Sequence, residues 1–184
     1  MFTDEKKLKR TSKFLSLVLR HKPQTIAITL DENGWTDVEV LMKQLDAFQH
    51  PITFQELEFL VKNNNKKRFA FNEDKTKIRA NQGHSVNVDL NLQPITPPSI
   101  LYHGTAEKFL NSIKEKGLIK KNRHHVHLSA DIETARSVGQ RHGKLIIFEV
   151  NTQEMMERGV LFFKSENNVW LTDTVPFHFL KQID

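Results

Sequence analysis

The first side chains whose types and spacing could do chemistry stand in the run Arg20-His21-Lys22-Pro23. A guanidinium offers a planar fork of donors that matches a phosphate, and a neighbouring histidine can donate a hydrogen bond or a proton. Because proline disfavours helical backbone at the residue before it, the run is placed where a helix ends. Cationic side chains also complement a helix C-terminus without any ligand. Taken alone, the run therefore favours the helix-end interpretation over an anion site.

The densest polar cluster is Arg123-His124-His125-Val126-His127-Leu128-Ser129. In a strand, His125, His127 and Ser129 point to the same face. Two histidines at this spacing can bind a metal, but the chain offers no third ligand by spacing and has no cysteine. We interpret the cluster as a row of hydrogen-bond donors that faces a ligand, and we expect no metal.

Three further sites are weaker on their own. The run Tyr102-His103-Gly104-Thr105 ends a predicted strand, where the glycine would permit close backbone approach to a ligand. Arg68 opens a predicted hairpin, and Arg79 closes it ahead of the polar stretch at residues 81–85. Arginines in such hairpins are usually solvated or contact a phosphate backbone. The chain has neither a GxGxxG nor a GxxxxGK[ST] motif, so a Rossmann site and a P-loop are not supported.

The elements before residue 87 indicate helices followed by a hairpin. Apolar spacing predicts a helix over residues 8–19, and alternation predicts a short strand over residues 26–30 that ends in the turn at residues 31–34. Thr36 with Glu39, and Thr53 with Glu56, are capping-box patterns ahead of two further helices. Strands at residues 69–71 and 76–80 complete a winged-helix pattern, a module that often binds nucleic acid.

A proline-rich stretch at residues 87–99 predicts a linker between two domains. We expect a first domain over residues 1–90, a linker over 91–99 and a second domain over 100–184. The second half predicts strands at residues 100–102, 126–128, 145–150, 161–164 and 169–171. Helices are predicted at residues 106–116, where Gly117 closes the helix, after Asp131, and before Gly159. The fold class is therefore α+β.

Composition indicates a globular protein with an anionic partner. The 184 residues carry a formal net charge of +5, which favours a partner such as nucleic acid, and the lack of cysteine excludes disulfides. No apolar run approaches the ~18 residues that a membrane helix needs. The N-terminus also lacks the apolar stretch of a secretory signal. We expect a cytoplasmic protein, with a monomer as the default.

Eight motifs in a fixed order resemble one family over residues 9–180: SKFLSLVLRHKP, LDENGWTDV, KKRFAF, IRANQGHS, LYHGT, HVHLSADIETA, VGQRHG and VWLTDTVPFHFL. Together they are similar to the NAD-dependent RNA 2′-phosphotransferases, the KptA family. This resemblance implies an N-terminal winged-helix RNA lobe and a C-terminal NAD lobe with the ADP-ribosyltransferase fold. Both expectations agree with the linker and with the change of pattern.

The resemblance also implies a reaction in two steps. An internal 2′-phosphate of RNA attacks the nicotinamide riboside carbon of NAD and expels nicotinamide. The neighbouring 2″-hydroxyl then attacks the ADP-ribosylated phosphate, which releases 2′-hydroxyl RNA and ADP-ribose 1″,2″-cyclic phosphate. NAD is consumed as a co-substrate. An RNA-processing role of the tRNA-splicing kind is the expectation.

Site residues are implied by the same motifs. The catalytic set of the family corresponds to Arg20, His21, Arg68 and Arg123. The NAD contacts correspond to His103, Gly104, Thr105, His125, His127, Ser129 and Arg141. We also expect RNA contacts from Lys22, Arg79, Gln82 and His84. The chain departs from the family pattern at Asn168, where glycine is usual, and asparagine tolerates the left-handed backbone that such a turn needs.

Two other functions are considered. One is an enzyme that stops after the first step and ADP-ribosylates terminal phosphates of RNA or DNA. The other is a winged-helix regulator with a degenerate ligand-sensing lobe, which is disfavoured because all four residues of the catalytic set are present.

Overall fold

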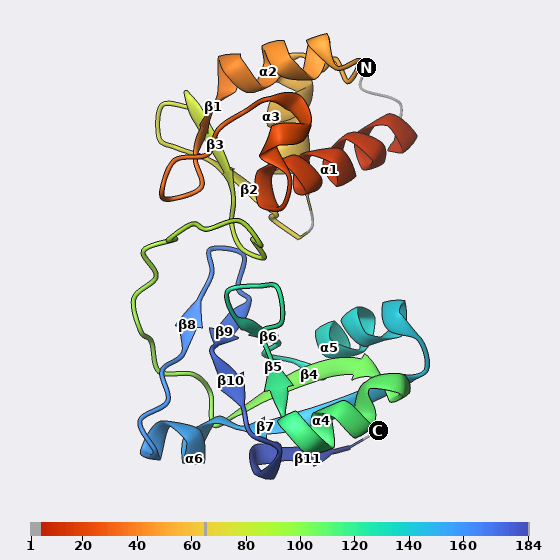
Figure 1. The fold of residues 1–184 in the computed structure, drawn as a ribbon, viewed down its shortest axis with the longest axis vertical. Helices are drawn as coiled ribbons and strands as arrows, with labels where there is room; N and C mark the ends of the chain where they lie inside the picture. Colours follow the sequence, from red (N-terminus) through yellow and green to blue (C-terminus); the bar gives the residue numbers. More distant parts are fainter. Residues whose placement is uncertain (1–4, 65, 184) are drawn as a thin grey trace. The chain divides into compact units, whose positions relative to one another are not determined.

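The computed structural model describes residues 5–64 and 66–183. The chain divides into two compact units, Met1–Asn91 and Leu92–Asp184. Over the described residues it mixes six α-helices with small sheets whose strands pair antiparallel (Figure 1). The predicted mixture of helices and strands is therefore confirmed. In the same part of the chain, no helix is long and apolar enough to cross a membrane.

Unit 1 packs three helices against one small sheet. Its elements are α1 (Glu5–Arg20), the 3-10 helix η1 (Pro23–Ile26), β1 (Thr36–Asp37), α2 (Val38–Ala47), α3 (Phe54–Lys62), β2 (Phe69–Phe71) and β3 (Lys77–Ala80). The sheet has the order β1-β3-β2, and β2 and β3 form the predicted hairpin. Leu15, Leu19, Leu41, Leu57 and Ile78 are fully buried in its core. Each such side chain stabilises the unit by about 1.5–3 kcal/mol, which fixes the end of α1 against the sheet.

Two predictions in unit 1 are wrong. Residues 26–30 form no strand, because Ile26 ends η1 and Ala27 takes a left-handed φ of 53°. The alternation reflects instead the burial of Ile26 and Ile28 in the core from an irregular segment. The residue that caps α2 is Asp37, whose carboxylate accepts from the Val40 amide at 3.0 Å, and not Thr36, which is buried in β1. The capping box of Thr53 with Glu56 is confirmed.

Unit 2 is built on small antiparallel sheets. Its strands are β4 (Ile100–Ala106), β5 (Leu118–Ile119), β6 (Val126–Leu128), β7 (Leu145–Asn151), β8 (Phe163–Lys164), β9 (Trp170–Thr172), β10 (Thr174–Val175) and β11 (Leu180–Gln182). The helices are η2 (Glu107–Phe109), α4 (Leu110–Lys116), α5 (Ile132–Gly139), η3 (Gln140–His142), α6 (Thr152–Glu157) and η4 (Phe177–Phe179). The sheet orders are β11-β7-β4, β6-β9-β8 and β10-β5.

Local signals in unit 2 fix several of these boundaries. Asp131 caps α5 as predicted, since its carboxylate accepts from the Thr134 amide at 2.7 Å. Gly117 ends α4 with a φ of 70°. Asn168 has a φ of 63°, so asparagine does adopt the left-handed turn at the position where the family pattern has glycine.

Helix α5 packs directly on β4 (Figure 1). A Cβ placed on Gly104 would lie 1.7 Å from the backbone oxygen of Ala135, and one on Gly139 would lie 2.8 Å from the amide nitrogen of Thr105. The contact is therefore backbone against backbone, and only glycine fits at Gly104. This close packing fixes the strand that carries His103.

Candidate active site

In unit 1, the polar stretch that follows β3 folds back onto the end of α1. The backbone amides of Ser85 and Val86 both donate to the carbonyl oxygen of Arg20, at 2.9 and 3.3 Å. The Ser85 hydroxyl lies 2.9 Å from Nδ1 of His21. These contacts satisfy a carbonyl that the helix end would otherwise leave without a partner. They also hold the Arg20–His21 pair from a segment 64 positions further along the chain.

The same stretch holds Arg68. Asn81 donates its backbone amide to the Arg68 carbonyl at 2.9 Å and its side-chain amide to the Lys67 carbonyl at 2.6 Å. Lys67 has a left-handed φ of 39°, and Nη1 of Arg68 reaches the side chain of Asn64 at 3.4 Å. Residues 81–86 therefore contact both predicted phosphate ligands of unit 1, the Arg20–His21 pair at one end and the Arg68 segment at the other.

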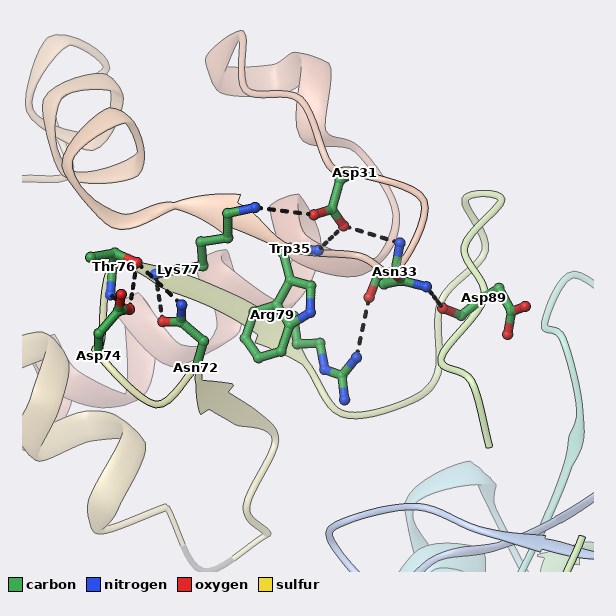
Figure 2. A network of polar contacts seen from close by, with 9 residues as sticks. All are labelled: Asp31, Asn33, Trp35, Asn72, Asp74, Thr76, Lys77, Arg79 and Asp89. Atoms are coloured by element: carbon green, nitrogen blue, oxygen red, sulfur yellow. Dashed lines mark hydrogen bonds and ion pairs between the residues drawn. The ribbon is translucent and has the colours of Figure 1, made fainter. Parts of the chain in front are cut away.

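Arg79 lies in a separate polar network, which Figure 2 shows. Its guanidinium sits 4.4 Å from the ring centroid of Trp35 and contacts the Asn33 carbonyl at 3.5 Å. Asn33 in turn donates to the Asp89 carbonyl at 2.7 Å, and Asp31 accepts from the Trp35 amide at 2.9 Å. The network ties the turn at residues 31–34 to β3 and to the chain that leaves the unit, which gives Arg79 a structural role.

The other predicted RNA contacts differ in exposure. Lys22 is exposed and Gln82 is half-buried. His84 is only 2% exposed, and its ring packs against Gly34, whose φ of 81° forms the turn there. Burial gives His84 a packing role, while its contact with RNA stays a prediction, as does that of Arg79.

In unit 2, hydrogen bonds join three of the predicted residues. Nδ1 of His103 lies 3.0 Å from the His127 carbonyl oxygen, and Nη1 of Arg123 lies 3.3 Å from Nδ1 of His127. A carbonyl only accepts, so Nδ1 of His103 carries a proton and its Nε2 is an acceptor when the ring is neutral. A guanidinium only donates, so the proton of His127 is on Nε2. The hydrogen positions thus follow from the chemistry of the partners.

The remaining predicted residues of unit 2 lie in or next to β4, β6 and η3. Tyr102 and Ser129 exchange two backbone hydrogen bonds of 2.8 Å, which bring Ser129 beside the strand of His103. The His125 ring lies 5.7 Å from the Phe163 ring. Thr105 is buried in β4, and Arg141 is exposed in η3. The backbone of Gly104 packs against Ala135 of α5, and its expected contact with a ligand stays a prediction.

Burial keeps two of these histidines neutral. It lowers the pKa of His103, and the hydrogen bond to the His127 carbonyl offsets only part of that effect. Burial also lowers the pKa of His125, with a smaller contribution from the nearby His124. Desolvation disfavours the imidazolium form, so His103 presents a neutral ring with an acceptor nitrogen near neutral pH.

We expect unit 2 to lose stability as the pH falls below about 6.5, the ordinary pKa of histidine. The folded His103 has a lowered pKa, so the unfolded chain binds protons more readily and acid favours unfolding. The stabilisation is present above the unfolded pKa and is lost as the pH falls through the folded one. Thermal unfolding from about pH 5 to 8 measures the effect.

His103→Gln is the matched variant, because its amide can still donate to the His127 carbonyl but does not titrate. Its midpoint should depend less on acid pH than that of the wild type. Equal slopes for the two proteins would contradict the assignment to His103.

The cluster contains no acidic partner for a metal. Among residues 5–64 and 66–183, no group of three histidine, aspartate or glutamate side chains is placed to hold an ion. Its groups are hydrogen-bond donors, acceptor nitrogens on its neutral histidines, and the cation Arg123. This combination suits an anionic ligand that also carries hydroxyl groups.

Comparison with known proteins identifies the family. The model of the "RNA 2′-phosphotransferase, Tpt1 / KptA family" matches residues 6–174. The chain belongs to this family. A "Probable RNA 2′-phosphotransferase" of Fusobacterium nucleatum is 54% identical over 94% of this chain and 97% of its own length. Proteins of the same description from Hahella chejuensis and Escherichia coli O9:H4 are 51% and 50% identical, covering 98% and 97% of this chain and 97% of each relative.

Within the phosphotransferase family motifs, the structure adds supporting residues that sequence reasoning missed. Ser85 and Asn81 both lie in the IRANQGHS motif, yet neither was selected as a site residue. Their partners His21 and Lys67 lie 64 and 14 positions away. Only the order of the family's motifs carried a signal for these contacts, since no local spacing links the two segments.

Proposed function

We propose that this protein removes an internal 2′-phosphate from RNA and consumes NAD in doing so. Membership of the RNA 2′-phosphotransferase family supports the substrate and the group transferred. The observation that carries the proposal is the double attachment of residues 81–86, which holds both the Arg20–His21 pair and the Arg68 segment within one unit.

NAD is proposed as the co-substrate, bound by unit 2. The acceptor nitrogen of His103 suits a ribose hydroxyl, and its lowered pKa keeps that nitrogen unprotonated. Arg141, with Thr105, His125, His127 and Ser129 as further contacts, suits the pyrophosphate and the nicotinamide riboside. A guanidinium binds a pyrophosphate oxygen through paired donors, which gives this assignment its physical basis.

The proposed chemistry has two balanced steps. In the first, a 2′-phosphate oxygen forms a bond to C1″ of the nicotinamide riboside, and the C–N bond breaks with its electron pair leaving on nicotinamide. In the second, the 2″-hydroxyl forms a bond to phosphorus and loses its proton. The bond from phosphorus to the RNA 2′-oxygen breaks, and that oxygen gains a proton and leaves as a hydroxyl.

We assign the phosphate to Arg20, His21, Arg68 and Arg123. Three of these side chains are guanidinium groups, which stabilise charge that builds on the phosphoryl oxygens in the second step. His21 donates a hydrogen bond or a proton to the same group. Unit 1, with its three helices and hairpin, is proposed as the winged-helix RNA lobe, and unit 2 as the ADP-ribosyltransferase-like lobe.

The test is incubation of the full chain with NAD and an oligoribonucleotide that carries one internal 2′-phosphate. Release of nicotinamide, 2′-hydroxyl RNA and ADP-ribose 1″,2″-cyclic phosphate is expected. The matched control is the same oligonucleotide with a single terminal phosphate. A stable ADP-ribosylated product from the control alone would overturn the proposal in favour of terminal-phosphate modification. Absence of nicotinamide release from either substrate would overturn an NAD-consuming function.

A further inference from the structure

The hydroxyl of Ser85 contacts the imidazole of His21, and the proposed reaction gives this serine no role. Oγ lies 2.9 Å from Nδ1, and the backbone amide of the same serine donates to the Arg20 carbonyl at 2.9 Å. Ser85 is thus attached at two atoms to two consecutive residues of the catalytic set. The amide contact fixes the serine relative to the end of α1, and the hydroxyl contact engages the His21 ring.

The segment around Ser85 is anchored on both sides. His84 is buried against Gly34, and the Val86 amide shares the Arg20 carbonyl at 3.3 Å. At the start of the stretch, Asn81 is 5% exposed and bonded to the Lys67 carbonyl. A hydroxyl on a segment held this way can fix the direction of the ring that it contacts.

The geometry of the contact distinguishes the two ring nitrogens, because Nδ1 of His21 is the one that faces the Ser85 hydroxyl. A serine hydroxyl both donates and accepts, so it can bond Nδ1 of His21 in either protonation state of the ring. When it donates to Nδ1 of the neutral ring, the proton of the imidazole is on Nε2. Nδ1 then bonds to the serine, so Nε2 is the nitrogen that contacts the phosphate.

We propose that Ser85 is a positioning residue that sets the ring direction and the tautomer of His21 for the phosphate. The assignment of the phosphate rests on the proposed function, whereas the effect on the tautomer does not. Ser85 itself is exposed, so removal of its hydroxyl leaves no cavity in the core. A loss of activity in Ser85→Ala would then report on His21 rather than on folding.

The first measurement is the side-chain nitrogen spectrum of His21 in the full chain at about pH 8, where an ordinary histidine is neutral. His21→Asn identifies the signal by its absence. The wild type and Ser85→Thr should show the proton on Nε2, because threonine retains the hydroxyl. Ser85→Ala should show a mixture of both tautomers. An unchanged His21 spectrum in Ser85→Ala would overturn the proposal.

The second measurement is the steady-state removal of a 2′-phosphate. Ser85→Ala should lower kcat by about 10–100-fold, as loss of an orienting partner does elsewhere, and leave KM for NAD unchanged. Ser85→Thr should restore most of the rate, and Ser137→Ala, an exposed serine on α5, is the matched control. Wild-type kcat in Ser85→Ala would overturn the role, as would a failure of Ser85→Thr to restore the rate. If the wild type removes no 2′-phosphate, the proposed function fails, and the spectrum still decides whether Ser85 sets the tautomer.

Discussion

Replacement of Arg123 by alanine is expected to make the ADP-ribosylated RNA accumulate while nicotinamide is still released. In the proposed second step, charge builds on the phosphoryl oxygens, and loss of one donor at such a position costs about 10²–10³ in rate. Arg123 is exposed and contacts Nδ1 of His127 at 3.3 Å, so the change removes a proposed phosphate ligand without opening the core. Single-turnover assays with a labelled 2′-phosphorylated oligonucleotide measure the two steps separately.

Two variants sharpen this test. Arg123→Lys retains the charge but loses the planar fork, so it should recover little of the second step. Arg158→Ala is the matched control, because that arginine belongs to the same unit and forms a surface ion pair of 2.8 Å with Glu154. Wild-type turnover in Arg123→Ala would exclude Arg123 from the second step, and equal slowing in Arg158→Ala would show an unspecific effect of charge.

Replacement of Gly104 by alanine is expected to unfold unit 2 or to destabilise it by about 3 kcal/mol or more, the upper range for overpacking. The new Cβ would lie 1.7 Å from the backbone oxygen of Ala135 and 2.5 Å from its carbonyl carbon. Neither atom is the end of a flexible side chain, so the whole of α5 would have to move away from β4. Urea unfolding followed by circular dichroism measures the loss.

Gly159→Ala separates this clash from ordinary backbone strain. Gly159 has a φ of 82°, and a Cβ on it would meet nothing within 4 Å. The variant should therefore cost only about 1–2 kcal/mol, the usual penalty for a left-handed backbone. If Gly104→Ala were no less stable than Gly159→Ala, the backbone packing of α5 on β4 would be refuted.

Sequence patterns correctly predicted the elements that are stabilised by contacts between residues close together in the chain. The Thr53 capping box, the Asp131 cap and the hairpin of β2 with β3 all follow from interactions within a few residues. The strand expected at residues 26–30 failed because Ile26 and Ile28 are buried by tertiary contacts from an irregular segment. An apolar alternation records which side chains are buried, and a strand is only one way to bury them.

The candidate site was predicted by motif order and not by spacing. The Arg20–His21 pair looked like an ordinary helix end, and only the resemblance linked it to Arg68 and Arg123. The contacts that orient these residues come from Asn81 and Ser85, which are distant in sequence from what they hold. Gly104 shows the same limit. The sequence indicates that another group approaches the Gly104 backbone closely, but not whether that group is a ligand or a helix.

The double hydrogen bond to the Arg20 carbonyl has an electrostatic consequence for phosphate binding. A helix C-terminus carries roughly half a negative charge, which would repel an anion brought next to it. The amides of Ser85 and Val86 direct the positive ends of their dipoles at that carbonyl. They offset part of the negative potential at the end of α1, so a phosphate at the proposed site would meet less repulsion from that helix.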